Sequence, residues 1–355
     1  MTPSFTYNGL PSRVIFGAGT LAQLPAEIDR LGIKRILVLA TPQQQADAER
    51  TAASLGGKAA GVFAEAAMHT PVDVTERALA AVKALGADGT LAIGGGSTTG
   101  LGKAIALRTD LPQIVVPTTY AGSEMTPILG ETKDGAKTTI RNLKVLPETV
   151  IYDVDLTLTL PPGLSGTSGI NAIAHAVEAL FAQDRNPVMS LMAGEGIRAL
   201  AKALPVIFRA PGDKAARSDA LYGAWLCGTC LGNVGMALHH KLCHTLGGSF
   251  DLPHAETHTV VLPHAVAYTA PAAPEAMAAI ARALGAADAA SGLYALAGAV
   301  GAKRSLRELG MPEAGIDRAA DLAMANPYWN PRPLERGAIR ALIARAWAGE
   351  QPVPK

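Results

Sequence analysis

The stretch TLAIGGGSTTGLGK, residues 90–103, decides the fold that we predict for this chain. It begins as a short apolar strand, passes through Gly94, Gly95 and Gly96, and continues into an alanine-rich pattern typical of a helix. Glycines carry no Cβ, so backbone N–H groups there can approach an anion, and the N-terminus of the following helix is its positive end. The stretch therefore predicts a strand, a turn and a helix that together bind a pyrophosphate.

The two common phosphate-binding fingerprints are both absent around these glycines. Lys103 is followed by Ala104 and not by serine or threonine, so the run is not a GxxxxGK[ST] loop. No GxGxxG follows the first long strand either. A tight turn that binds no ligand therefore stays open as an alternative, because glycines also serve turns.

Hydroxyl side chains follow two of the predicted strands. Ser97 and Thr98 come directly after the glycines, and Thr118, Thr119 and Ser123 follow the buried strand IVVP. In an open parallel sheet both groups would lie at the carboxyl ends of strands, where ligands bind. These positions predict the edge of a dinucleotide site.

The strand at residues 36–39 is followed by Ala40-Thr41-Pro42 and by no acidic residue. A carboxylate there would hydrogen-bond the ribose 2′-hydroxyl of one cofactor and repel the 2′-phosphate of the other. We therefore predict weak discrimination between NADH and NADPH. The predicted cofactor-binding residues are Thr41, Gly94, Gly95, Gly96, Ser97, Thr98, Thr118, Thr119, Ser123 and Lys144.

The order of the patterns predicts two domains. Short β-branched runs alternate with helical stretches over the first 150 residues, which indicates βαβ units and a parallel sheet. Beyond Pro161-Pro162-Gly163 the β-branched runs nearly vanish, and alanine- and leucine-rich helical patterns take over. We predict an α/β dinucleotide-binding domain at residues 1–157 and an all-helical domain at residues 158–355. Helices are expected at residues 72–85, 170–182, 188–204, 214–232, 276–284, 292–300 and 337–348.

Composition excludes several classes of protein. The 355 residues carry 31 basic and 30 acidic side chains, a net charge of +1, with no basic run, so nucleic acid is not an expected partner. The N-terminus resembles no signal peptide and no uninterrupted apolar span occurs, which predicts a cytoplasmic protein without a membrane partner. Three cysteines make no disulfide framework, and the pair Cys227 and Cys230 lies in an apolar helical pattern that indicates packing.

Histidines concentrate in the helical half. Six of the eight lie between His239 and His264. Asn171 and His175, and likewise His240 and His244, are four residues apart and would share one helix face. Gly247-Gly248 is expected to end the second of these helices before His254, so three segments could converge. Single histidines are more often satisfied core residues, and we expect this of His69, His258 and His264.

Several motifs together resemble the iron-containing (group III) alcohol dehydrogenase family over nearly the whole chain. They are GGGSTTGLGKAIA, PTTYAGSEMT, the segment from Asn171 to Glu178, and the run HHKLCHTLGGSFDLPH that ends at His254. The resemblance implies a dehydroquinate synthase-like fold, with an N-terminal dinucleotide-binding domain, a helical domain and the site in the cleft between them. HHKLCH and Asn171 are most similar to the branch of this family that reduces maleylacetate with NADH or NADPH.

The resemblance also assigns candidate metal ligands and departs from the family at one of them. The family's aspartate and three histidines correspond to Asn171, His175, His240 and His254, and His244 matches a further histidine near the nicotinamide. An amide holds a divalent ion more weakly than a carboxylate does. We therefore expect no required metal; if one binds, His175, His240 and His254 are its expected ligands.

The resemblance implies a dicarboxylate substrate whose carbon–carbon double bond is conjugated to a ketone. Hydride addition to that bond places negative charge on the ketone oxygen, which hydrogen-bond donors can stabilise. We expect His244 to act as proton donor or electrophile, with His240, His175, His254 and Asn171 completing the pocket. Lys241 is a candidate for binding a carboxylate. Arg141 and Lys144, in the expected sheet edge AKTTIRNLK, are further candidates or solvated surface charges.

Three other functions remain open on the sequence. One is a metal-dependent alcohol or polyol dehydrogenase of the same family, and another is a cyclising lyase of the dehydroquinate synthase type. The third is a nucleotide-binding protein without catalysis. The resemblance also implies a homodimer.

Overall fold

The computed structural model describes residues 4–134 and 136–353, which fall into two compact units. One unit is Leu10–Thr159, and the other runs from Leu160 onward and includes the segment that ends at Gly9. The sequence places this division two residues earlier, between residues 157 and 158, and puts the N-terminal segment in the first domain. Periodicity cannot show which unit an irregular terminal segment contacts.

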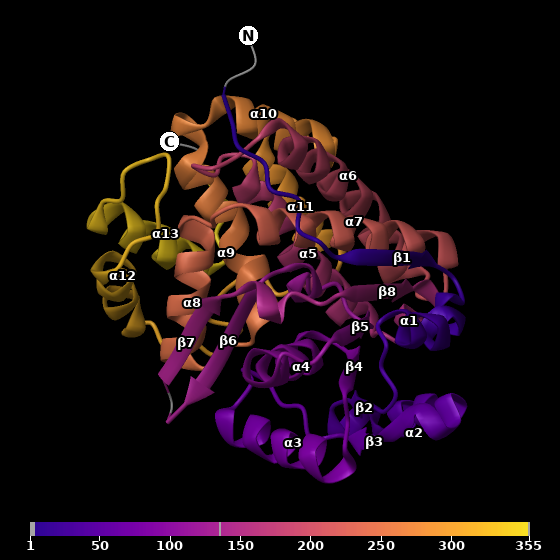
Figure 1. The fold of residues 1–355 in the computed structure, drawn as a ribbon. Helices are drawn as coiled ribbons and strands as arrows, with labels where there is room; N and C mark the ends of the chain where they lie inside the picture. The colour runs from indigo at the N-terminus through magenta and orange to yellow at the C-terminus, as the bar shows by residue number, and fades with distance from the viewer. Residues whose placement is uncertain (1–3, 135, 354–355) are drawn as a thin grey trace. The chain divides into compact units, whose positions relative to one another are not determined.

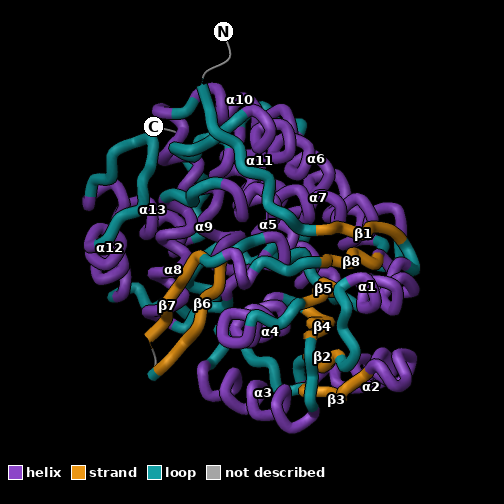
Figure 2. Tube along the Cα trace, viewed as in Figure 1, coloured by secondary structure: helices purple, strands orange, loops and turns teal. Residues whose placement is uncertain are grey.

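A parallel sheet forms the centre of the first unit, which confirms the predicted fold class. Its strand order is β1-β8-β5-β4-β2-β3, and Figure 2 shows its strands in orange. Every neighbouring pair runs in parallel, as helical crossovers require. The strands are β1 (Arg13–Gly17), β2 (Ile36–Leu39), β3 (Ala59–Phe63), β4 (Gly89–Gly94), β5 (Gln113–Pro117) and β8 (Thr149–Asp153).

Helices cover both faces of this sheet because successive strand residues point to opposite sides. Ile36 and Val38 pack with residues of α1 (Leu24–Arg30) and α2 (Gln45–Leu55). Leu37 points to the other face and packs with residues of α3 (Val72–Leu85) and α4 (Gly96–Thr109). The apolar residues of β2 are therefore buried on both faces, which explains its unbroken apolar run.

The expected sheet edge AKTTIRNLK is not part of this sheet. β7 (Ala136–Arg141) pairs antiparallel with β6 (Ile128–Lys133) in a separate two-stranded ribbon. The predicted strand is therefore present, but in this ribbon, and the sequence named no partner for it. A strand pattern reports local extension and does not specify which strand it pairs with.

The second unit is helical, as predicted, and Figure 1 labels its helices. They are α5 (Pro162–Ala179), α6 (Pro187–Arg209), α7 (Lys214–Asn233), α8 (Leu238–Phe250), α9 (His254–Thr269), α10 (Pro274–Leu284), α11 (Ala289–Ala299), α12 (Gly315–Ala325) and α13 (Arg336–Ala348). Among the described residues no single helix is long and apolar enough to cross a membrane, although α7 and α8, bent by 94°, pass together on length and composition.

The helix that carries HHKLCH continues through Gly247 and Gly248, so the predicted stop was wrong. α8 ends only at Phe250, where Asp251 takes a left-handed conformation with φ 51°. Leu246 and Leu252 are both buried in the core that α8 shares with α9, α12 and α13. A glycine inside a helix costs about 1 kcal/mol relative to alanine, so packing of this kind can override the stop signal.

Close packing explains the two neighbouring cysteines of α7. Cys227 and Cys230 are buried and unbridged, and a Cβ added at Gly196 of α6 would lie 2.7 Å from Cys227 Sγ. Cys230 Sγ lies 3.6 Å from the carbonyl oxygen of Met189. Burial raises the pKa of Cys230 to about 12, so its thiol stays protonated at neutral pH.

Lys103 of α4 is fully buried, so its side chain is not available to bind a phosphate. Its Nζ donates to the carbonyl oxygens of Ser123 at 2.5 Å, Thr126 at 2.7 Å and Ile128 at 2.8 Å. Burial lowers the pKa of Lys103 to about 7, while the charge of the buried Glu124 opposes this shift. Lys103 therefore fixes the loop that follows β5.

Replacing Lys103 by methionine is expected to lower the free energy of unfolding by about 3–5 kcal/mol. The carbonyl groups of Ser123, Thr126 and Ile128 would lose their buried donor, and Glu124 would lose a nearby positive charge. Denaturant unfolding measures this change. Lys144→Met is the control, since Lys144 pairs with Asp110 at 3.2 Å on the surface and its loss should cost under about 1 kcal/mol. Equal losses in both variants would contradict the role of Lys103.

Candidate functional site

The glycine turn has the geometry that the sequence predicts. β4 ends at Gly94, Gly95 precedes the helix, and α4 begins at Gly96. Gly94 has φ 150°, and a Cβ there would lie 2.6 Å from Thr98 Oγ1. A Cβ at Gly95 would lie 3.1 Å from Thr119 Cγ2. A side chain at either position would therefore clash with Thr98 or Thr119, which explains why the turn needs glycine.

Two further predicted residues join the turn through Gln44. Gln44 Nε2 donates to Thr118 Oγ1 at 3.2 Å, and Thr41 Oγ1 donates to Gln44 Oε1 at 3.3 Å. The backbone N–H of Thr118 also donates to the carbonyl oxygen of Gly94 at 2.9 Å. β2 and β4 are neighbours here, with β3 on one side and β5 on the other, which makes this edge a topological switch point. The sequence analysis missed Gln44, although it lies three residues after Thr41.

The structure does not bring Lys144 to the glycine turn. Gln113 Nε2 donates to the carbonyl oxygen of Lys144 at 3.4 Å, and Gln113 is the first residue of β5. The turn lies beyond the other end of this strand, next to Thr118. Ser123 lies in the loop after β5, where its carbonyl oxygen is held by Lys103.

Three helices bring six histidine rings together in the second unit. Ring centroids lie 5.1 Å apart for His175 of α5 and His240 of α8, and 5.0 Å apart for His240 and His258 of α9. The rings of His239 and His258 are 4.8 Å apart, and those of His254 and His258 are 4.3 Å apart. His244, one turn after His240, lies 6.1 Å from it. These residues form what we call the histidine cluster.

Of the three histidines expected to be satisfied core residues, His264 is in the core, but neither of its ring nitrogens has a hydrogen-bond partner among the described residues. His264 is buried, and burial lowers its pKa to about 4. His69 is exposed, with φ 64°, so its assignment was wrong. His258 is buried but lies within the histidine cluster. Its position four residues after His254, on one helix face, was the signal for this placement.

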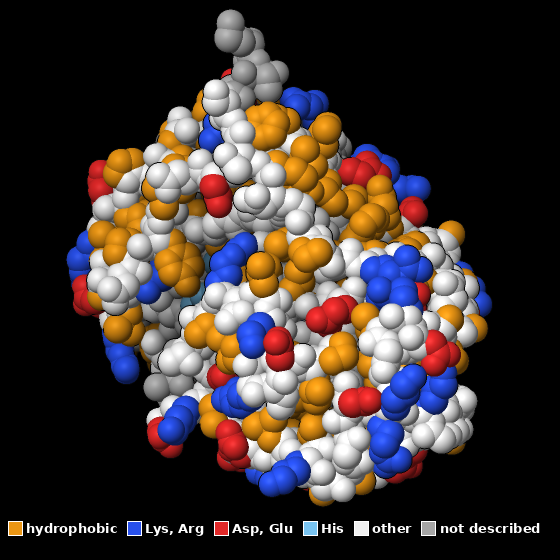
Figure 3. Space-filling model, viewed as in Figure 1, with side chains coloured by type: hydrophobic (Ala, Val, Ile, Leu, Met, Phe, Trp, Pro, Cys, Tyr) orange, Lys and Arg blue, Asp and Glu red, His pale blue; other side chains and the backbone are white. Residues whose placement is uncertain are grey.

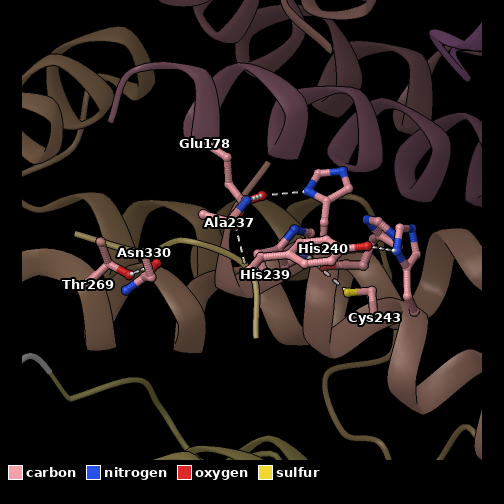
Figure 4. A network of polar contacts seen from close by, with 10 residues as sticks. Glu178, Ala237, His239, His240, Cys243, Thr269 and Asn330 are labelled. Carbon is pink, nitrogen blue, oxygen red and sulfur yellow. Dashed lines mark hydrogen bonds and ion pairs between the residues drawn. The ribbon is translucent and has the colours of Figure 1, made fainter. Parts of the chain in front are cut away.

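Glu178 links the helices that carry the cluster. Its Oε1 accepts a hydrogen bond from the backbone N–H of His239, and its Oε2 accepts from the backbone N–H of Ala237 and contacts His240 Nδ1, each at 2.7 Å (Figure 4). Ala237 and His239 lie at the N-terminus of α8, whose positive end favours a carboxylate. Burial alone would raise the pKa of Glu178, but the charge and hydrogen bond of His240 hold it below its ordinary value. The sequence analysis quoted Glu178 but gave it no role, although it lies three residues after His175.

The cluster changes from buried to exposed along its length. His175, His239 and His258 are buried, whereas His244 and His254 are exposed. Burial and the charges of neighbouring histidines lower the pKa of His175, and burial lowers that of His239 to about 3. The rings of His175, His239 and His258 are therefore neutral at physiological pH, and the exposed rings are the ones that a substrate can reach.

Asn171 and Cys243 are buried beside the histidine cluster. Asn171 is buried, and its Oδ1 has no hydrogen-bond partner among the described residues. Cys243 Sγ lies 3.4 Å from His239 Nε2. Burial raises the pKa of Cys243 well above its ordinary value, which keeps the thiol protonated.

Lys241 and His244 share a neighbour that the sequence analysis did not identify. Tyr328 Oη lies 3.2 Å from His244 Nδ1, and Lys241 Nζ lies 5.9 Å from the centre of the Tyr328 ring. Tyr328 lies between α12 and α13, 84 residues beyond His244. The periodicity of a helix or strand relates residues only a few positions apart, so it could not predict this contact.

The donor set fits the iron site of the resembled family poorly. Within the described residues, the histidine, cysteine and carboxylate ligand atoms that come within 4.8 Å of one another belong to His239, His240 and His258. The expected set His175, His240 and His254 does not form such a group. The nearest carboxylate, Glu178, is already held by two backbone N–H groups and His240. Non-haem Fe²⁺ sites typically combine two histidines with a carboxylate, which this group of three histidines lacks, so we derive no step through a metal.

Charged side chains of both signs are mixed on the surface of the described residues. Figure 3 shows lysine and arginine interspersed with aspartate and glutamate over the face in view. Several of these charges form exposed ion pairs, such as Arg77 with Asp73 and Arg198 with Glu195. Such pairs contribute little to stability.

Comparisons with known proteins match both units. A model described as iron-containing alcohol dehydrogenase matches residues 11–154, and a model described as Fe-containing alcohol dehydrogenase family, C-terminal, matches residues 165–347. The chain is 60% identical over 348 residues to a maleylacetate reductase of Rhizobium sp. strain MTP-10005, covering 98% of this chain and 99% of the relative.

Solved structures give the same picture. A maleylacetate reductase from Agrobacterium tumefaciens is 60% identical with a TM-score of 0.96, covering 99% of this chain and all of the other. An iron-containing alcohol dehydrogenase from Corynebacterium glutamicum is 42% identical with a TM-score of 0.94, covering 99% of both chains. The likeness therefore extends over both units.

Proposed function

Because this chain belongs to the iron-containing alcohol dehydrogenase family, we propose that it reduces the conjugated carbon–carbon double bond of maleylacetate to 3-oxoadipate with NADH or NADPH. Support comes from the similar proteins named maleylacetate reductase. The observation that carries the proposal is the histidine cluster together with two polar neighbours. Asn171 stands where the family has a carboxylate ligand, and the carboxylate of Glu178 is already bound by backbone N–H groups at the start of α8 and by His240. Such a cluster can stabilise an enolate, whereas reduction of a simple carbonyl by this family would need a metal.

The proposed cofactor site is the edge formed by Thr41, Gln44, Gly94–Gly96 and Thr118. The backbone N–H groups of the glycine turn and the N-terminus of α4 suit a pyrophosphate. Thr41 and Gln44, which follow β2, carry no negative charge to repel a 2′-phosphate. Use of both NADH and NADPH is therefore part of the proposal.

The residues of the helical unit would handle the charge that the reduction creates. When bound, NADH or NADPH supplies the hydride that adds to the carbon β to the ketone. His244, exposed at the end of the cluster, would donate to the ketone oxygen or give up a proton. Lys241 would bind a substrate carboxylate, and the buried His175, His240 and His258 would keep the side chains of the site in position. We further propose that the substrate carries two carboxylates, that the protein is a homodimer and that it is located in the cytoplasm.

Chelation tests the metal-independent part of this proposal. Protein treated with EDTA and shown by elemental analysis to hold no iron or zinc is expected to oxidise NADH with maleylacetate at the full rate. The Asn171→Asp variant is the control, because a restored carboxylate should raise the affinity for Fe²⁺ or Zn²⁺ without raising activity. Activity that returns only with metal, and only on simple aldehydes or ketones, would identify a metal-dependent alcohol dehydrogenase instead.

A further inference from the structure

The segment between α12 and α13, residues 326–335, contains no helix or strand and crosses to the histidine cluster. We call this segment the strap. It carries the sequence NPYWNPRPLE, which includes three prolines. Prolines fix φ and reduce the conformations open to the chain, so a segment of this composition can hold one path without regular hydrogen bonding.

The end of α9 anchors the strap. Tyr268 Oη donates to the carbonyl oxygen of Pro333 at 2.6 Å, and Arg332 Nη1 donates to the carbonyl oxygen of Tyr268 at 3.0 Å. The guanidinium of Arg332 also lies 4.4 Å from the centre of the Tyr268 ring. Thr269 Oγ1 donates to Asn330 Oδ1 at 3.4 Å, and Figure 4 shows these two side chains together. These contacts fix the strap just beyond Tyr328.

Tyr328 is the strap residue that meets the catalytic candidates. Its hydroxyl lies 3.2 Å from His244 Nδ1, and the two rings are nearly perpendicular at 78°. The ammonium of Lys241 lies on the same phenol ring, 5.9 Å from its centre. One side chain therefore lies beside both the exposed His244 and the half-buried Lys241, two residues to which the sequence assigns chemistry.

We propose that Tyr328 is a positioning residue for His244, whose hydroxyl donates to Nδ1 and so places the proton of the neutral imidazole on Nε2. A neutral imidazole has one nitrogen that donates and one that accepts, and the hydrogen bond of one decides the role of the other. The phenol is the better donor, because its oxygen lone pair is delocalised into the ring. Burial raises the pKa of Tyr328, so its hydroxyl keeps its hydrogen at neutral pH.

This assignment decides between the two roles left open for His244, and to that extent it rests on the proposed function. A neutral ring with its proton on Nε2 can stabilise an enolate oxygen by a hydrogen bond. It cannot readily give that proton away, because an imidazolate would remain. His244 is then the electrophile, and the proton that ends on the α carbon comes from solvent.

The first test reads the imidazole directly and needs no substrate. Long-range ¹H–¹⁵N correlation spectra of histidine-labelled protein, recorded about two units above the ordinary histidine pKa, report which ring nitrogen is protonated. The signals of His244 are identified by their loss in His244→Ala. We expect a protonated Nε2 and a hydrogen-bonded, unprotonated Nδ1, and in Tyr328→Phe a shift of Nδ1 toward the value of an unbonded nitrogen. A proton on Nδ1 in the wild type, or identical His244 signals in both proteins, would overturn the proposal.

The second test separates positioning from general stability. Tyr328→Phe removes only the hydroxyl, and we expect kcat for maleylacetate to fall roughly tenfold while KM changes by less than about twofold. Tyr294→Phe is the matched control, because Tyr294 Oη also makes one hydrogen bond, 2.9 Å to Gly349, under an arginine 4.8 Å from its ring. Equal loss of kcat in both variants would mean that the hydroxyl of Tyr328 is merely structural.

A third variant tests the strap itself. Tyr268→Phe removes the hydrogen bond to Pro333 and leaves Tyr328 intact. A positioning role predicts a smaller loss of kcat in the same direction and a partial shift of Nδ1. If the wild type failed to reduce maleylacetate, the proposed function would fall, but the spectra of His244 would still decide the role of Tyr328.

Discussion

Replacing His244 by alanine is expected to lower kcat for maleylacetate by a factor on the order of 10²–10⁴, the range found when a catalytic hydrogen-bond or proton donor is removed. His244 is an exposed ring at the end of the histidine cluster, where a substrate can reach it. The rings of His175 and His258 cannot replace it, because both are buried and a substrate does not reach them. Steady-state oxidation of NADH with maleylacetate measures the effect.

Two controls show that this loss is chemical. Thermal unfolding should hardly change, because an exposed side chain contributes little to the core. Added imidazole should restore part of the lost rate by occupying the space left by the ring. A loss of kcat below about threefold, or one matched by weaker NADH binding, would contradict a role for His244 at the reacting atoms.

Replacing Glu178 by glutamine is expected to lower the free energy of unfolding by about 3–5 kcal/mol, because the buried carboxylate that accepts from two backbone N–H groups and contacts His240 is lost. The carboxylate of Glu178 has three hydrogen-bond partners, which are the backbone N–H groups of Ala237 and His239 and the Nδ1 of His240. A glutamine offers one oxygen, and its NH₂ would face at least one other donor. Activity should fall with stability, since His240 loses the partner that orients its ring.

The control for this prediction is Glu195→Gln in the same helical unit. Glu195 pairs with Arg198 on the surface, and its replacement should cost less than about 1 kcal/mol in denaturant unfolding. Similar losses at the two positions would contradict the central role of Glu178.

The stabilisation by Glu178 should also depend on pH in a predictable direction. The pKa of the folded carboxyl is held below its ordinary value of 4.5, so the unfolded chain takes up this proton first as pH falls. The stabilisation is therefore complete above that value and is lost as pH falls through the folded pKa. The difference between wild type and Glu178→Gln should shrink over this acidic range.

Local patterns predicted the framework of both units because their signals lie within a few residues. The alternation of apolar strands and helices from residue 13 to residue 153 specified the parallel sheet, and the three glycines specified the turn between β4 and α4. Spacing of four residues placed His240 and His244 on one face of α8. Each of these inferences depends on backbone geometry that repeats along the chain.

Partners distant in the sequence were not predictable in this way. Glu178 reaches His240 across 62 residues, and Tyr328 reaches His244 across 84. β7 pairs with β6 outside the main sheet, and Lys144 lies at the opposite end of β5 from Thr118. Nothing within a few residues of these positions encodes such contacts.

The sequence by itself determined the α/β and helical units, the glycine turn and the group of histidines from which the site is built. Only the tertiary structure decided that His258 joins the cluster, that Glu178 holds α8 and that the strap brings Tyr328 to His244. The physical reason is that secondary structure follows from repeating local geometry, whereas a site follows from which buried polar groups find partners once the helices pack.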